Sequence, residues 1–289
     1  MQSVREFLCK KEFIEVRAPV IEPYSDPGIR GAEFFSIDIS GKQHVIMSAF
    51  TLHKHIISSY LGKIFSFAPC LRYEPEESAK TGRHLIEFYQ IEVESKDSSY
   101  KDAMKYAEEL IAYVIKSVKE KYPEELAILE RKLIIPAVPF KKIPHSEALK
   151  MAKELGFDIK DKELPWEAEK AISLQFSEPF FITDYPKGSR GFYDKDGITT
   201  LLDFDMMYPE GFGEASSGGQ REDDYEKALE KLKKIDDPKK YSCYLKELKK
   251  SPCKTAGFGI GLERLTRFIC GLPHIEQACL FPKVPGVKD

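Results

Sequence analysis

Residues 257–265 read Gly-Phe-Gly-Ile-Gly-Leu-Glu-Arg-Leu, with a glycine at every second position of an apolar run. Alternating glycines clear side chains from one face of an extended segment, so that a flat ligand can lie against the backbone. The residues that follow predict a helix with Arg264 in its first turn, where a guanidinium can hold a phosphate or stack on a ring. The spacing differs from that of the dinucleotide fingerprint. The alternative interpretation is a turn with tight helix–strand packing.

Residues 63–94 predict two strands joined by a polar loop. Residues 63–73 are rich in aromatic and β-branched side chains, and residues 84–94 alternate apolar and polar residues. Residues 74–83 between them are charged and contain a proline and a glycine, as expected of a loop. Cations for phosphates, a carboxylate for an adenine amino group and an aromatic face for its ring therefore gather on one hairpin. These residues are Arg72, Glu74, Arg83, His84 and Phe88.

The two segments together resemble the second and third motifs of the class II aminoacyl-tRNA synthetases, and residues 13–19 resemble the first motif, which ends in a proline. The resemblance is closest to the aspartyl/asparaginyl branch and covers nearly the whole chain. The segments that match this branch are residues 83–88, 183–186, 213–221 and 281–283. The resemblance implies an α+β fold, with an antiparallel β-sheet flanked by helices, and a homodimer built on the first motif.

Composition sets limits on the protein class. The chain has 289 residues, of which 42% are hydrophobic and 31% charged, enough for one large core or two small ones. It has no apolar run long enough to span a bilayer and no signal peptide, so we expect a cytoplasmic protein without membrane contact. The net charge of −3 gives no support for a basic face that binds a polyanion. Six scattered cysteines without a Cys-x-x-Cys pair predict reduced thiols and no zinc site.

No linker divides the chain, and we expect residues 1–289 to form one catalytic domain. Apolar periodicity and charged starts predict helices at residues 98–122, 146–155 and 223–234. Residues 180–184 and 199–207 are expected to be strands. Residues 187–197 are glycine-rich and charged, and the sequence leaves open whether they form a mobile lid or an exposed hairpin tip.

The resemblance also concerns what precedes the first motif. Aspartyl- and asparaginyl-tRNA synthetases carry an N-terminal barrel that reads the anticodon, whereas this chain begins inside the first motif. We therefore expect a catalytic core with no anticodon-binding barrel. Such cores are similar to synthetase paralogues and to ammonia-dependent asparagine synthetases. The archaeal asparagine synthetases related to asparaginyl-tRNA synthetase match at residues 52–55, 216–222 and 281–286.

The resemblance implies an ATP-dependent, adenylate-forming ligase with ATP as substrate and Mg²⁺ as cofactor. Arg72 would bridge the α-phosphate and the reacting carboxylate, and Arg264 would lie above the adenine ring, so both are expected to be catalytic. The implied ATP-binding residues are Arg72, Glu74, Arg83, His84, Phe88, Gly261 and Arg264. The implied Mg²⁺ ligands are Asp205, Glu214 and Ser217. Asp205 lies nine positions before Glu214, a longer gap than is usual in the aspartyl enzymes. Taken singly, each residue also has a plain structural interpretation as a solvated, core or turn residue.

The substrate pocket is expected to contain Lys54, Gln90 and Arg221. A Lys–Arg pair can neutralise a carboxylate, and a neutral amide in its place would leave excess positive charge. We therefore expect aspartate as the substrate. The alternative interpretation is that Lys54 is a surface residue of a helix. Thr51 stands where the aspartyl enzymes have a glutamine that holds the substrate amine.

The leading hypothesis is an ammonia-dependent asparagine synthetase, which forms asparagine, AMP and pyrophosphate from aspartate, ATP and ammonia. One alternative is an asparaginyl- or aspartyl-tRNA synthetase-like protein without the anticodon domain, although the charge balance disfavours tRNA as a partner. Another is an inactive nucleotide-binding regulatory paralogue.

Overall fold

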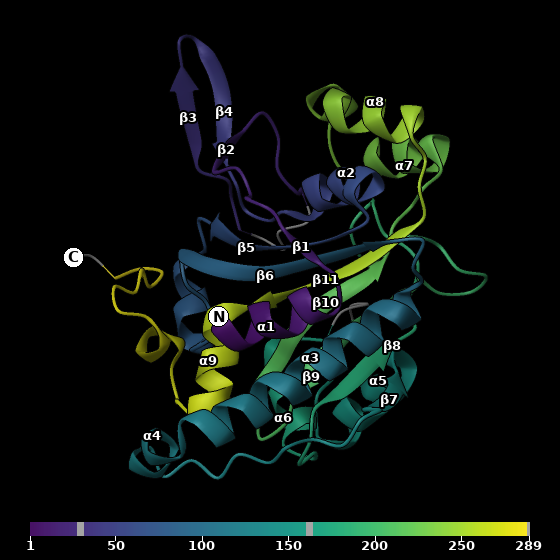
Figure 1. Ribbon diagram of the computed structural model, residues 1–289. Coiled ribbons are helices and arrows are strands. Elements are labelled where there is room, and N and C mark those ends of the chain that lie inside the picture. The colour runs from purple at the N-terminus through teal and green to yellow at the C-terminus, as the bar shows by residue number, and fades with distance from the viewer. Residues whose placement is uncertain (28–31, 160–163, 288–289) are drawn as a thin grey trace.

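An eight-stranded sheet crosses the molecule with the strand order β1-β5-β6-β11-β10-β9-β8-β7 (Figure 1). The computed structural model describes residues 1–27, 32–159 and 164–287. The strands are β1 (Ile14–Glu15), β5 (Lys63–Leu71), β6 (Glu87–Lys96), β7 (Lys141–Pro144), β8 (Phe180–Thr183), β9 (Asp203–Tyr208), β10 (Gly213–Gln220) and β11 (Thr255–Gly261).

The inner pairs of this sheet are antiparallel, and the two outermost pairs are parallel. Antiparallel pairing links β5, β6, β11, β10, β9 and β8 in turn, while β1 pairs parallel with β5 and β7 parallel with β8. Long connections separate the strands of both parallel pairs, as parallel pairing requires, since a hairpin can join only antiparallel neighbours. The predicted antiparallel sheet is confirmed for the part that carries the site.

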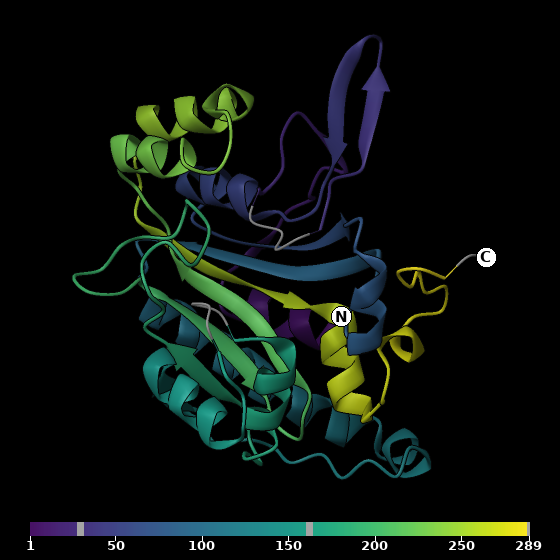
Figure 2. The ribbon, with the colours of Figure 1, turned by 180° about the vertical axis from the view of Figure 1, so that it is seen from behind.

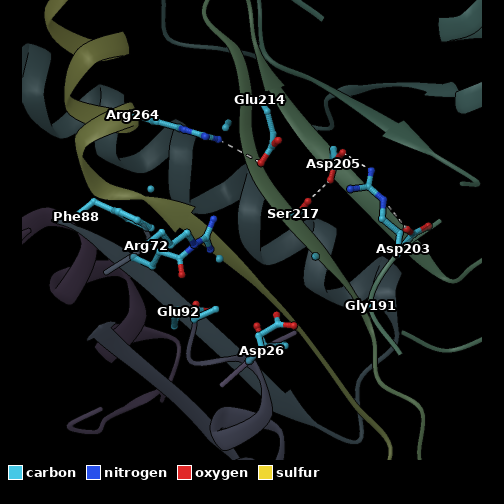
Figure 3. Close-up of a pocket in the computed structure, with 18 of the residues that line it drawn as sticks. Asp26, Arg72, Phe88, Glu92, Gly191, Asp203, Asp205, Glu214, Ser217 and Arg264 are labelled. Atoms are coloured by element: carbon cyan, nitrogen blue, oxygen red, sulfur yellow. Dashed lines mark hydrogen bonds and ion pairs between the residues drawn. The ribbon is translucent and has the colours of Figure 1, made fainter. Parts of the chain in front are cut away.

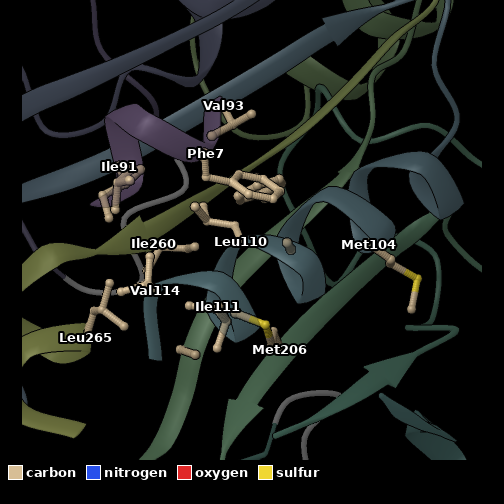
Figure 4. Packing of buried hydrophobic residues seen from close by; sticks show 14 of the residues in the cluster. Phe7, Ile91, Val93, Met104, Leu110, Ile111, Val114, Met206, Ile260 and Leu265 are labelled. Carbon is tan, nitrogen blue, oxygen red and sulfur yellow. The ribbon is translucent and has the colours of Figure 1, made fainter. Parts of the chain in front are cut away.

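The main apolar core lies between the sheet and α3 (Tyr100–Lys121), with α1 (Gln2–Lys10) packed beside α3. Ser99 and Asp102 form a capping box that starts α3. From α3, Leu110, Ile111 and Val114 point into this core (Figure 4). They meet side chains of α1, β6, β9, β11 and α9 (Leu262–Cys270): Phe7, Ile91, Val93, Met206, Ile260 and Leu265.

The remaining helices lie toward the two ends of the sheet. α2 (Thr51–Leu61) contacts β5 and β6 and packs with α8 (Ser242–Lys250), which contacts α7 (Tyr225–Leu232). α5 (His145–Glu154) and α6 (Trp166–Ser173) pack together near β7 and β10, and α4 (Pro123–Ile128) follows α3. Short 3₁₀ helices are η1 (Glu76–Thr81), η2 (Pro238–Tyr241) and η3 (Ile275–Ala278). Among the described residues, no helix is both long enough and apolar enough to cross a membrane.

A second, three-stranded sheet was not expected from the sequence. It consists of β2 (Ile21–Glu22), β3 (Ser36–Ile39) and β4 (Lys42–Ile46) in the order β2-β4-β3. The β3–β4 hairpin projects from the body of the molecule in both ribbon views (Figures 1 and 2). All of β3 is exposed, so it lacks the alternation of buried and exposed residues by which a strand is recognised.

The other predicted elements are present with shifted ends. The three predicted helices correspond to α3, α5 and α7, and the strand at residues 180–184 corresponds to β8. The strand expected at residues 199–207 begins only at Asp203, because Thr200 and Leu201 form isolated bridges to Pro186 and Asp196. The two strands of the 63–94 hairpin end at Leu71 and begin at Glu87, and η1 lies in the loop between them.

Candidate active site

A cavity of about 450 Å³ opens over the central strands, and every residue that the sequence nominated for the site lines it (Figure 3). Sheet register explains this convergence. β11 pairs with β6 so that Gly259 faces Glu92 and Gly261 faces Gln90, while Ser217 of β10 lies opposite Gly259. The nominated residues that line the cavity are Lys54, Arg72, Glu74, Arg83, His84, Phe88, Gln90, Asp205, Glu214, Ser217, Arg221, Gly261 and Arg264. Their individual roles stay predictions.

One end of the cavity combines an arginine with an aromatic ring. The Arg72 guanidinium carbon lies 5.1 Å from the centroid of the Phe88 ring, and Arg72 Nε donates to the Ser48 carbonyl at 3.2 Å. Burial raises the pKa of the neighbouring Glu74 carboxyl, although nearby Arg72 acts in the opposite direction. A planar cation, an acceptor and a ring face on one wall are suited to a nucleotide base and its phosphates.

Arg264 lies on the opposite wall, in the first turn of α9, as the sequence predicts. Its Nη1 is 3.3 Å from Glu214 Oε1, and its Nε donates to the Arg83 carbonyl at 3.4 Å. Figure 3 shows the Arg264–Glu214 pair across the cavity from Phe88 and Arg72. The guanidinium is thus held by two acceptors while it lines the cavity.

Arg83 and His84 differ in charge. Arg83 Nη1 lies 2.6 Å from Oε2 of Glu169, a buried residue of α6 that sequence analysis missed. Burial, with help from Arg264 and Arg83, lowers the pKa of His84 to about 3, so its imidazole is neutral near pH 7. Thr81 Oγ1 donates to the Ser78 carbonyl and lies 2.6 Å from His84 Nδ1, so His84 Nδ1 carries the ring proton. His84 therefore needs a second proton before it can act as a cation toward a phosphate.

The three residues expected to bind Mg²⁺ all line the cavity, but their oxygens differ in how many protein groups they already contact. Glu214 and Ser217 line the cavity, but both oxygens of Asp205 accept hydrogen bonds from protein groups. The donors are Arg190 Nη2 at 2.5 Å, the Tyr185 hydroxyl at 2.7 Å and the Ser217 hydroxyl. Within the described ranges no cluster of three or more histidine, cysteine or acidic residues could hold a metal.

The hard oxygens of Glu214 and Ser217 still fit Mg²⁺, which binds through one or two carboxylates and completes its shell with phosphates and water. A carboxylate has about four lone-pair positions, and those of Asp205 already accept three hydrogen bonds. Its role as a direct ligand stays a prediction.

The amino-acid end of the cavity contains more negative charge than expected. Lys54 Nζ lies 2.5 Å from Glu92 Oε2 and donates to the Phe258 carbonyl at 2.8 Å. Arg221 donates from Nε and Nη2 to Glu94 at 3.0 Å, and its Nη1 is 3.4 Å from Asp194. Although burial acts to raise it, the cations Arg221 and Lys54 lower the pKa of Glu94, which stays ionised.

The predicted Lys54–Arg221 pair is therefore not an uncompensated pair of cations. The expectation that asparagine would leave one cation unpaired is wrong, because Glu92 and Glu94 already pair with both. The alternative of Lys54 as a surface residue is also wrong, since only 2% of its side chain is exposed.

Sequence reasoning missed a group of acidic and loop residues in the cavity wall. Residues 187–197 are neither an exposed tip nor separate from the site, because they contribute Ser189, Arg190, Gly191, Tyr193 and Asp194 to the lining. Asp26, Glu92 and Asp203 line it as well. A usable signal existed for Glu92 and Glu94, because they follow Gln90 at alternate positions of β6 and so share its face.

Two of these missed carboxyls have raised pKa values. Burial, which acts against the charge of Arg221, raises the pKa of Asp194 to about 7. Burial together with the charges of Asp194 and Asp205 raises the pKa of Asp203 to about 9. Perturbed carboxyls in a cavity wall are typical of a functional site.

A family model for class II tRNA synthetases (D, K and N) matches residues 1–285. The chain belongs to this family. It is accordingly an enzyme of the ATP-dependent ligase class, and the sequence-based recognition of the aspartyl/asparaginyl branch is confirmed. Asparagine–tRNA ligase of Pyrococcus furiosus is 33% identical over 294 residues, which cover 99% of this chain and 67% of that protein. The Thermococcus gammatolerans asparagine–tRNA ligase is 32% identical with the same coverage.

Solved structures agree with the class II fold. Asparaginyl-tRNA synthetase of Pyrococcus horikoshii complexed with asparaginyl-adenylate superposes with a TM-score of 0.93 at 31% identity, over 99% of this chain and 67% of that one. An aspartyl-tRNA synthetase of Entamoeba histolytica superposes with a TM-score of 0.81 at 24% identity, over 100% of this chain and 57% of that one, and supports the fold alone. The chain thus spans about two thirds of the length of the asparaginyl relatives.

Proposed function

We propose that this ligase activates asparagine with ATP and transfers the asparaginyl group to tRNA. The observation that carries the proposal is the pairing of Lys54 with Glu92 and of Arg221 with Glu94. With Asp194 also beside Arg221, three carboxylates face two cations, so a substrate carboxylate would add negative charge to a site that has no excess positive charge. The neutral side chain of asparagine would add no charge to this site.

A carboxamide also matches the hydrogen-bonding groups present. Its oxygen accepts and its NH₂ donates twice. Arg221 has five N–H groups, and Glu94 and Asp194 take three of them, which leaves two for a carbonyl oxygen. A carboxylate such as Glu92, which lines the cavity, can accept from the NH₂ group. The names of the relatives, asparagine–tRNA ligases, support the same substrate.

The proposed first step forms an adenylate. A carboxylate oxygen of asparagine attacks the α-phosphorus of ATP, the bond to the bridging oxygen breaks, and pyrophosphate leaves. Arg72 would hold the α-phosphate beside the carboxylate, Glu74 would accept from the adenine amino group, and Phe88 and Arg264 would face the ring. Bound Mg²⁺, held by Glu214 and Ser217, would neutralise phosphate charge. A tRNA hydroxyl then attacks the carbonyl carbon and AMP leaves. The main contribution of the chain is alignment and charge compensation.

A second candidate is ammonia-dependent synthesis of asparagine from aspartate. One observation favours it, namely that Lys54 adds a second buried cation to the cavity beside the Arg221 guanidinium. With Asp194 protonated, the two cations and the two remaining carboxylates balance, and an aspartate side chain becomes easier to accept. In this candidate an aspartyl-adenylate reacts with ammonia in place of tRNA.

One assay separates the candidates. The chain is incubated with Mg²⁺, ATP and labelled pyrophosphate, with asparagine or aspartate, and exchange of label into ATP is measured. Products are then identified after addition of tRNA or of ammonium. We expect asparagine-dependent exchange and labelled asparaginyl-tRNA. Aspartate-dependent exchange with release of free asparagine from ammonium would instead establish the second candidate.

The charge argument predicts the effect of Glu92→Gln. This change leaves the Lys54 ammonium without its closest carboxylate and so makes the site more positive. We expect the ratio of kcat/KM for aspartate to that for asparagine to rise about tenfold, the effect of roughly 1.4 kcal/mol. Glu87→Gln, at an exposed position of the same strand, is the matched control. An unchanged ratio in Glu92→Gln would remove charge balance as the basis of selectivity.

A further inference from the structure

Ser217 and Asp205 are direct partners across β10 and β9, and the Ser217 hydroxyl donates a hydrogen bond to Asp205 Oδ1. A serine hydroxyl has one proton and two lone pairs. Once the proton is directed at Asp205, the lone pairs of Ser217 Oγ are left for other partners. Ser217 is an exposed residue of the cavity wall, so these lone pairs are accessible from the cavity.

The Asp205 side chain that accepts this hydrogen bond is buried, with an exposed fraction of 2%. A buried carboxylate needs a paired cation and satisfied lone pairs. Arg190 supplies the charge, with Nη2 at 2.5 Å from Asp205 Oδ2, and the Tyr185 hydroxyl donates to the same oxygen at 2.7 Å.

The Arg190 guanidinium is itself fixed in place. Its central carbon lies 3.7 Å from the centroid of the Tyr185 ring, and its Nε is 3.6 Å from Oδ2 of Asp203. The side chain is 8% exposed. The contacts therefore run in a line from Asp203 through the Arg190 guanidinium to Asp205 and on to Ser217, and Figure 3 shows the three labelled residues Asp203, Asp205 and Ser217 on one wall of the cavity.

We propose that Arg190 is a positioning residue for the metal–nucleotide site. It holds the Asp205 carboxyl in place, Asp205 accepts the hydrogen bond of the Ser217 hydroxyl, and Ser217 Oγ faces the cavity with its lone pairs toward the divalent cation that accompanies ATP. This inference rests on the ATP site of the proposed function and is independent of the amino acid and of tRNA. Residues 187–197 would thus contribute to metal binding through Arg190.

Direct coordination of the metal by Asp205 makes the opposite prediction for the loss of Arg190. If Asp205 were itself a metal ligand, Arg190 would compete with the metal for its oxygens, and removal of Arg190 would tighten metal binding. In the arrangement proposed here, removal of Arg190 weakens metal binding. The sign of the change therefore distinguishes the two.

The test measures Mn²⁺ affinity by electron paramagnetic resonance for the chain saturated with the β,γ-imido analogue of ATP, without amino acid or tRNA. We expect Arg190→Met and Ser217→Ala each to raise the Mn²⁺ Kd about tenfold, the scale of lost outer-shell support. The double variant should be no weaker than the weaker single variant, because both changes remove the same ligand. Arg190→Lys, which keeps the charge, should retain most of the affinity.

Lys187→Met is the matched control, since it removes a positive charge from the same loop at an exposed position whose Nζ contacts the Ile198 carbonyl. It should leave the Mn²⁺ Kd unchanged.

If Arg190→Met fails to fold, Asp205→Asn tests the same line of contacts and should weaken Mn²⁺ binding. Direct coordination by Asp205 would instead require a far larger loss of Mn²⁺ affinity in Asp205→Asn than in Ser217→Ala. An unchanged or lower Kd in Arg190→Met, or fully multiplicative effects in the double variant, overturns the proposal. Either result leaves asparagine activation untouched, whereas no Mn²⁺–nucleotide binding by the unaltered chain would overturn the ATP site itself.

Discussion

The glycines of residues 257–261 serve two purposes at the level of single residues. Gly259 and Gly261 line the cavity, as expected of a surface for a flat ligand. Gly257 instead makes room for a neighbouring side chain, since a Cβ there would lie 2.1 Å from Oε2 of Glu94 and 2.1 Å from the carbonyl oxygen of Val93. The same glycine pattern therefore accommodates the carboxylate that holds Arg221.

Gly257→Ala should destabilise the fold by about 3 kcal/mol, because the added methyl group meets backbone that cannot move aside. Gly259→Ala is the matched control, since its nearest contact would be a side-chain oxygen of Glu92 at 3.1 Å and not backbone, and it should cost about 1 kcal/mol. Urea denaturation gives both free energies of unfolding. Equal stability of Gly257→Ala and the unaltered chain would contradict the steric argument.

Residues 90–94 show why the charge balance around the substrate site could not be predicted from the sequence. The positions of Lys54 and Arg221 could be predicted because each falls in a recognisable motif. Their charge balance could not, since it depends on which carboxylates the pairing of β6 and β11 places beside them. A pairwise argument about two cations omitted Glu92 and Glu94, which lie across the strands from the glycines.

At the level of elements, local patterns predicted the strands and helices that bury one face. The β5–β6 hairpin, β11 and α9 carry strong alternation or glycine signals and were all predicted. The parallel edge pairs and the exposed β2-β4-β3 sheet were not, because partners distant in sequence define the first and no buried face marks the second. The conformation of residues 187–197 could not be predicted either, since long-range contacts hold this irregular segment in place.

The hydroxyl of Tyr193 is one of these contacts, as it donates to Asp26 Oδ2 at 2.6 Å. Tyr193→Phe removes the donor from a buried carboxylate, at a cost on the order of 1 kcal/mol. We expect amide hydrogen exchange in residues 187–197 to accelerate several-fold, as measured by mass spectrometry. Tyr60→Phe, which removes a 2.7 Å bond from an exposed tyrosine to Glu247, should leave exchange in this loop as it is. Unchanged exchange in Tyr193→Phe would show that other contacts are sufficient.

At the scale of the whole molecule, a single catalytic domain over residues 1–289 and a homodimer built on the first motif stay predictions. The distribution of buried carboxyls has a more direct consequence. Burial raises the pKa of Glu22 to about 8, and Asp194 and Asp203 are raised as well, to about 7 and about 9. For each, the folded state holds a proton that the unfolded state releases at lower pH. The stability from these groups is complete below their unfolded pKa values and is lost as pH rises through the folded values.

Glu22→Gln isolates one of these groups. Glu22 is 1% exposed and lies beside α2, with its Oε2 3.1 Å from Nδ1 of His53. Burial lowers the pKa of His53 to about 4, so this imidazole does not titrate above pH 7. Between pH 7 and pH 9 the ionisation of Glu22 should remove about 1 kcal/mol from the free energy of unfolding, and glutamine cannot ionise.

The advantage of Glu22→Gln over the unaltered chain should therefore grow by about 1 kcal/mol over this range, measured by urea denaturation at a series of pH values. Both proteins should still lose stability toward pH 9, because Asp203 continues to titrate in each. Glu120→Gln, on the exposed face of α3, provides the control and should follow the unaltered chain in parallel. If the difference between Glu22→Gln and the unaltered chain were constant from pH 7 to pH 9, Glu22 would be ionised in the folded protein throughout. The buried Glu22–His53 pair would then carry a net charge that some other group must compensate.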